Sequence, residues 1–111
     1  MTYQFEGNSY TIIYNGQLYN AKDLRNELSN EGFSFSGNSD AEVLLKGYIH
    51  FGNDILNKLN GVFGFAIWNE NKQELFIARD HLGVKPFYYY LKENYFIFAS
   101  EIKSILKFPR D

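Results

Sequence analysis

Polar and apolar residues alternate along the first part of the chain, in residues 3–5 and again in residues 10–14. A period of two is typical of a strand with one face turned towards a core. Gly7 and Asn8 lie between the two stretches, and both residue types favour tight turns. The pattern therefore predicts a β-hairpin at the start of the chain.

The period then changes to that of a helix. Asn20 occupies the expected N-cap, and Asp23 follows three residues later in the place of a capping-box partner. Leu24 and Leu28 give this helix one apolar stripe. Gly32 is expected to end it in the left-handed conformation.

A second helix is predicted to start at Ser39, with Glu42 at the capping-box position, and to stop at Gly52. Its inward face is expected to consist of Val43, Leu44, Gly47, Tyr48 and Phe51. Glycine inside a helix costs about 1 kcal/mol relative to alanine, so Gly47 indicates close packing against a neighbouring element. Residues 54–59 are expected to form a short third helix.

From Gly61 onwards the pattern is that of strands. Residues 62–68 (VFGFAIW) are apolar throughout, as in a strand that is covered on both faces. The remaining expected elements are a polar turn at 69–73, strands at 74–79, 87–91 and 95–99, and a helix from Ser100 to Phe108. Strands, helices, an antiparallel meander and a last helix together predict one α+β unit.

Charge and composition exclude several functions. Eleven basic and thirteen acidic residues give a formal net charge of −2, so we expect no nucleic acid partner and no membrane partner. No run of about 20 apolar residues and no secretory leader is found, which favours a soluble, cytoplasmic protein. The lack of cysteine removes disulfides, thiolate metal ligands and thiol nucleophiles together. His50 and His81 are too far apart in sequence to suggest a metal pair, so no metal site is expected.

Asn15 and Gly16, within YNGQLYN (14–20), are the most informative pair of residues. Asn15 can offer a side-chain NH₂ group and Gly16 an unshielded backbone N–H, and two donors aimed at one point are what an oxyanion hole needs. The alternative is a tight hairpin turn, because Asn-Gly is the strongest short turn signal. Asp40, taken alone, is an acidic residue in the first turn of a helix, where it complements the helix dipole.

Five segments in this order resemble one family: YNGQLYN (14–20), SDAEVLL (39–45), LNGVFGFAIWN (59–69), ARDHLGVKPFYYY (78–90) and FASEIKSIL (98–106). They resemble the glutaminase domain of class II glutamine amidotransferases. The resemblance is greatest to the N-terminal domain of glutamine-hydrolysing asparagine synthetases, and it covers nearly all of residues 1–111. These residues correspond to the C-terminal portion of that domain.

The resemblance implies a fold and a mechanism. The fold is an N-terminal-nucleophile hydrolase-like αββα sandwich, which has four layers and antiparallel sheets; here it is expected to be incomplete at its N-terminal side. In the mechanism, an N-terminal cysteine attacks the side-chain amide of glutamine, with its own α-amino group as the base, and ammonia is released. In whole family members the ammonia passes to a synthetase domain that uses ATP and Mg to amidate aspartate. No cofactor is expected for the present chain.

The resemblance also assigns roles to individual residues. Asn15 and Gly16 match the two oxyanion donors, and Asp40 matches the carboxylate that holds the α-ammonium group of glutamine. Gln17 occupies a position where the family usually has glutamate, which keeps an acceptor but removes a negative charge. The cysteine and the arginine loop that grips the glutamine carboxylate belong to family sequence upstream of Met1. We therefore expect the isolated chain to lack glutaminase activity.

Two other functions stay open at this point. The chain could be a non-catalytic binding or assembly module, or one half of a split amidotransferase whose other polypeptide brings the cysteine. If upstream strands are missing, uncovered strands would favour a homo-oligomer.

Overall fold

The computed structural model describes residues 1–81 and 84–92. The elements along these residues are β1 (Thr2–Phe5), β2 (Asn8–Leu18), α1 (Ala21–Asn30), α2 (Asp40–Phe51), the 3₁₀ helix η1 (Gly52–Lys58), β3 (Gly61–Asn69), β4 (Glu74–His81) and β5 (Val84–Lys92). The strand predicted at 95–99 and the helix predicted from Ser100 lie outside the described residues.

The chain divides into two compact units. The sheet unit consists of Met1–Gly16 and the described residues from Val62 onwards, and the helical unit is Gln17–Gly61. The last residues of β2 and the first residue of β3 therefore belong to the helical unit.

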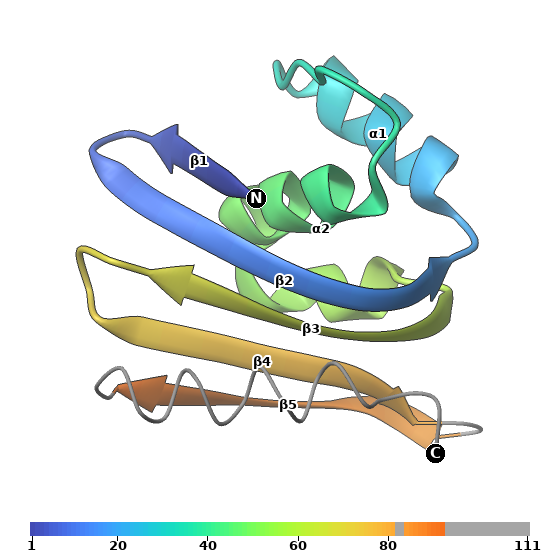
Figure 1. Ribbon diagram of the computed structural model, residues 1–111. Coiled ribbons are helices and arrows are strands. Elements are labelled where there is room, and N and C mark those ends of the chain that lie inside the picture. Colours follow the sequence, from blue (N-terminus) through green and yellow to red (C-terminus); the bar gives the residue numbers. More distant parts are fainter. Residues whose placement is uncertain (82–83, 93–111) are drawn as a thin grey trace. The chain divides into compact units, whose positions relative to one another are not determined.

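The sheet, as far as the structure describes the chain, has five strands in the order β1-β2-β3-β4-β5, which can be followed in Figure 1. The β1–β2, β3–β4 and β4–β5 pairs are antiparallel. The first hairpin turns at Glu6 and Gly7, whose φ angles are 48° and 83°. Two successive positive φ values are what a two-residue hairpin turn requires. The predicted hairpin is confirmed, with Asn8 already the first residue of β2.

Both faces of the sheet are buried along β3 and β4. One face carries a cluster of aliphatic and indole side chains: Ala66, Leu75 and Ile77, with Ile13 and Trp68 packed against them. The opposite face is aromatic, with ring contacts between 4.9 and 5.9 Å that link Phe63, Phe65, Phe76, Tyr88 and Tyr90. Successive side chains of a strand point to opposite faces, so this burial confirms the prediction of a strand that is apolar on both sides.

The β3–β4 connection is polar, as predicted. The side chain of Asn69 accepts hydrogen bonds from the backbone N–H groups of Asn71 (3.0 Å) and Lys72 (3.1 Å). An asparagine that bonds its own backbone a few residues on is a common way to close a turn. The turn sets the register in which Asn69 lies opposite Glu74.

Helix α1 follows its predicted pattern. Leu24 and Leu28 are its buried residues. Gly32 has a φ of 104°, and its N–H donates to the carbonyl of Ser29 (3.1 Å) while the N–H of Phe33 donates to the carbonyl of Leu28 (3.1 Å). These two bonds form a Schellman motif, which satisfies the last carbonyls of the helix.

The capping interaction predicted for Asn20 is wrong. Asn20 occupies the N-cap position of α1, but its side chain makes no capping hydrogen bond. The amide instead donates from Nδ2 to the carbonyl of Lys58 (2.6 Å) and accepts at Oδ1 from the N–H of Asn60 (3.0 Å). A tertiary contact has taken the place of the local one.

Helix α2 begins as predicted, because the hydroxyl of Ser39 accepts a hydrogen bond from the N–H of Ala41 at 3.1 Å. The second half of the expected capping box is wrong. The carboxylate of Glu42 faces Ser36 and Lys46 and does not return to the helix start. A Cβ on Gly47 would lie 2.6 Å from Cδ1 of Ile55, so the predicted close packing at this glycine is confirmed.

Candidate functional site

Asn15 and Gly16 lie inside strand β2, which continues to Leu18. The hairpin-turn alternative for this pair is therefore wrong. The strand leads within a few residues into a helix, because β2 ends at Leu18 and α1 starts at Ala21.

Gly16 has a backbone conformation that residues with a side chain rarely adopt. Its φ is 124°, a region that L side chains avoid. A Cβ at this position would overlap the carbonyl oxygen of Val62 and would lie 2.8 Å from Cα of Phe63. Glycine inside a strand often marks the close approach of another backbone, and here that backbone is β3.

Gln17 is exposed in β2. Its backbone lies against Gly61, because a Cβ on Gly61 would overlap the carbonyl oxygen of Gln17 and would lie 3.0 Å from Cα of Leu18. The end of β2 and the start of β3 are thus in close backbone contact in the helical unit.

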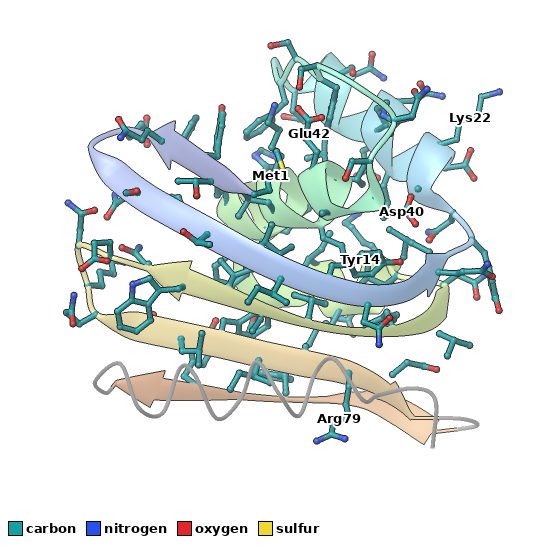
Figure 2. The ribbon with its side chains drawn as sticks, viewed as in Figure 1. Met1, Tyr14, Lys22, Asp40, Glu42 and Arg79 are labelled. Carbon is teal, nitrogen blue, oxygen red and sulfur yellow. The ribbon has the colours of Figure 1, made fainter. Side chains whose placement is uncertain are left out.

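Asp40 is the first residue of helix α2 and is half-buried. Figure 2 shows Asp40 at the N-terminal end of the helix, and Glu42 follows two residues later. Its Oδ2 atom accepts a hydrogen bond from the backbone N–H of Leu18 at 3.2 Å. The carboxylate is therefore tied to the last residue of β2, the strand that also carries Asn15 and Gly16.

These positions divide between the two units of the chain: Asn15 and Gly16 belong to the sheet unit, and Gln17 and Asp40 to the helical unit. In chemical terms the set offers a side-chain amide and a backbone N–H as donors, and a carboxylate at a helix N-terminus as acceptor. Two donors suit an oxyanion, and a carboxylate suits an ammonium group.

The contacts that Leu18 and Asn20 make were not foreseen from the sequence. The partner of Leu18 lies 22 residues away, and the partners of the Asn20 side chain lie 38 and 40 residues away. No local pattern encodes such distances, and an asparagine just before a helix reads as an N-cap.

The comparisons with known proteins decide the family. The family model of the glutamine amidotransferase domain matches residues 3–110. The chain belongs to the glutamine amidotransferase domain family. The resemblance inferred from the five sequence segments is thereby confirmed.

Among its relatives, this amidotransferase chain is 52% identical over 109 residues to asparagine synthetase [glutamine-hydrolyzing] 3 of Bacillus subtilis, covering 98% of the chain and 18% of the relative. It is 40% identical over 103 residues to amidase chry2 of Gibberella zeae, covering 93% of the chain and 15% of that protein. The chain thus spans less than a fifth of the length of these relatives.

A solved structure supports the fold. Glutamine phosphoribosylpyrophosphate amidotransferase of B. subtilis, complexed with ADP and GMP, is 30% identical with a TM-score of 0.61, over 72% of this chain and 19% of that one. The expected α+β fold of the N-terminal-nucleophile type is confirmed. The described residues contribute one antiparallel sheet and the helices α1 and α2 to it.

The described residues contain neither a membrane-spanning helix nor a cluster of metal ligands. Neither α1 nor α2 combines the length and the apolar character that a bilayer-spanning helix requires. Within the same residues, no three acidic, histidine or cysteine side chains gather as metal ligands would.

Proposed function

We propose that this chain forms the oxyanion-stabilising and substrate-ammonium-binding part of a glutaminase site. The observation that carries the proposal is the hydrogen bond from Leu18 N–H to Asp40 Oδ2. It fixes a carboxylate at the end of β2, and the family membership supplies the reaction class.

In the proposed reaction a thiolate attacks the side-chain amide carbon of glutamine, and negative charge develops on the amide oxygen. The NH₂ group of Asn15 and the N–H of Gly16 donate to that oxygen, while Asp40 accepts from the α-ammonium group of the substrate. The thiolate comes from outside these 111 residues, because they contain no cysteine. The C–N bond then breaks, the proton that the α-amino group took from the thiol passes to the leaving nitrogen, and ammonia is released. The acyl group stays on the sulfur as a thioester, which water hydrolyses to glutamate.

The relatives that are glutamine-hydrolysing asparagine synthetases suggest what happens to the ammonia. We infer that a protein containing this domain delivers it to an ATP- and Mg-dependent amidation of aspartate, as in the glutamine-hydrolysing asparagine synthetases. The glutaminase step itself needs no cofactor in this proposal, and glutamine is the small-molecule partner of the chain.

Calorimetric titration of the chain with glutamine tests the proposal. Substitution of Asp40→Ala removes the acceptor of the substrate ammonium, so we expect the affinity to fall by roughly 10- to 100-fold, as for a lost charge-assisted hydrogen bond.

Asp23→Ala is the matched control. Asp23 is an exposed acidic residue in the first turn of α1, so its removal changes the net charge equally without touching the proposed site. Equal glutamine affinities of the Asp40→Ala and Asp23→Ala variants would contradict the role of Asp40.

A further inference from the structure

The side chain of Asn20 joins two segments of the helical unit. Its Nδ2 donates to the carbonyl of Lys58 (2.6 Å) and its Oδ1 accepts from the N–H of Asn60 (3.0 Å). Both halves of the amide are used at once, which only asparagine or glutamine can do. The Asn20 side chain therefore links the start of α1 to residues 58–60 and does not cap the helix.

Backbone contacts extend this junction along the chain. The N–H of Tyr19 donates to the carbonyl of Asn60 at 2.7 Å. The next residue, Gly61, lies so close to Gln17 and Leu18 that a Cβ would overlap the carbonyl oxygen of Gln17. Residues 17–20 are thus held against residues 58–61 from end to end.

The held segment contains the donor to Asp40. Leu18 lies between Gln17, packed on Gly61, and Tyr19, bonded to Asn60, and its own N–H donates to Asp40 Oδ2 at 3.2 Å. The N–H of Leu18 lies in the peptide plane that joins Gln17 to Leu18, and the carbonyl oxygen of the same plane packs against Gly61. Contacts that hold residues 17–20 against residues 58–61 therefore restrain the direction of this N–H.

We propose that Asn20 is a positioning residue for the substrate-binding carboxylate of Asp40: its amide holds residues 17–20 so that the N–H of Leu18 orients Asp40. The inference rests on the proposed function, in which Asp40 binds the ammonium group of glutamine. One carboxylate oxygen of Asp40 is engaged by Leu18, which restrains the rotation of the group.

A double-mutant cycle measured by NMR tests the structural half of the inference. The amide proton shift of Leu18 reports its hydrogen bond to the carboxylate, so Asp40→Asn changes this shift in the otherwise unchanged chain. In the Asn20→Ala background we expect the same substitution to leave the Leu18 shift nearly unchanged. An undiminished effect of Asp40→Asn in that background would overturn the inference.

Glutamine affinity, measured by calorimetric titration of the same variants, tests the effect of Asn20 on substrate binding. We expect Asn20→Ala to weaken binding by roughly tenfold, the effect of one charge-assisted hydrogen bond, and to make the added effect of Asp40→Ala much smaller. Additive losses would overturn the positioning role. If Asp40→Ala alone leaves the affinity unchanged, the proposed function fails, while the Leu18 shifts still decide whether Asn20 orients Asp40.

Three further variants separate positioning from general destabilisation. Asn26→Ala makes the same change at an exposed site on α1, and Ile55→Val trims a buried side chain of η1 away from the junction. In both variants, Asp40→Asn should still change the Leu18 amide proton shift in full. Loss of this shift change in either variant would contradict the inference.

Should Asn20→Ala fail to fold, Asn20→Asp takes its place, because it keeps the acceptor for Asn60 and removes the donor to Lys58. In the Asn20→Asp background we expect Asp40→Asn to change the Leu18 shift less than in the parent chain. An equally large change would overturn the proposal.

Discussion

Gly16 shows how a single residue type is dictated by its surroundings. Its positive φ of 124° and its approach to the carbonyl oxygen of Val62 both exclude a side chain. Either constraint alone would favour glycine, and together they leave no alternative. The residue proposed to offer an oxyanion donor is thus also required by the packing of β2 on β3.

Substitution of Gly16→Ala is expected to destabilise the chain by about 3 kcal/mol, because backbone strain and overlap with Val62 add. Urea-induced unfolding measures the loss. Gly7→Ala is the control, since Gly7 also has a positive φ of 83° but open space around its Cβ position. A loss at Gly16 no larger than the loss at Gly7 would contradict the close approach.

At the same scale, the sequence predicts the local partners of a residue better than the distant ones. The Schellman motif at Gly32 and the cap at Ser39 involve neighbours within five residues, and both were predicted correctly. The side chains of Asn20 and Glu42 were assigned local bonds that the structure replaces with others. A cap is worth about 1 kcal/mol, and Asn20 makes two hydrogen bonds, with Lys58 and Asn60, in its place.

At the scale of elements, the start of α2 is held by a buried ion pair. Lys46 Nζ lies 2.8 Å from Glu42 Oε2, one helical turn away, and both side chains are almost fully buried. Glu42 also accepts from the N–H of Ser36 (3.0 Å), and Lys46 donates to the carbonyl of Ser34. The pair therefore ties the preceding loop to the helix that carries Asp40.

The surroundings of Glu42 make this element sensitive to acid. Burial alone would raise the pKa of the Glu42 carboxyl, but hydrogen bonds from Lys46 and Ser36 and the charge of Lys46 outweigh it and hold the pKa below its ordinary value of 4.5. A lowered folded-state pKa stabilises the fold at pH values above 4.5, and this contribution is lost as the pH falls through the folded-state pKa.

Glu42→Gln is accordingly expected to lower the free energy of unfolding at pH 7 by about 3 kcal/mol, because it removes the negative charge that compensates the buried Lys46 ammonium. The variant should also lose less stability than the parent chain as the pH falls below 4.5, because it lacks the carboxyl whose lowered pKa stabilises the folded chain. Urea unfolding at several pH values measures both effects.

The surface pair of Glu27 and Lys58 provides the control. Their side chains lie 2.9 Å apart but are 44% and 36% exposed, so Glu27→Gln should cost less than about 1 kcal/mol. If Glu27→Gln and Glu42→Gln lower the free energy of unfolding equally, burial of the Glu42–Lys46 pair does not increase its contribution to stability.

Periodicity predicted the position of α2 but not how completely it is buried. One inward face was expected, whereas every residue from Glu42 to Gly47 is buried. A helical pattern identifies apolar positions on the buried face, whereas Glu42 and Lys46 are charged. Their burial could be predicted only if their ion pair were known.

At the scale of the whole molecule, the order of elements and the two apolar faces of β3 could be predicted from composition and period alone. The hydrogen bonds that the Asn20 side chain makes with Lys58 and Asn60 could not, because the partners lie 38 and 40 positions further along the chain.

The central claim is that Asn15 and Gly16 stabilise the oxyanion of glutamine hydrolysis for a cysteine that lies outside these residues. Ammonia release from glutamine should be measured for the chain alone, and for the chain mixed with a separately expressed cysteine-led segment of the glutaminase domain. We predict no release by the chain alone, release by the mixture, and a rate about 100-fold lower when the mixture contains Asn15→Ala. Release by the chain alone, or an unchanged rate with Asn15→Ala, would contradict the account.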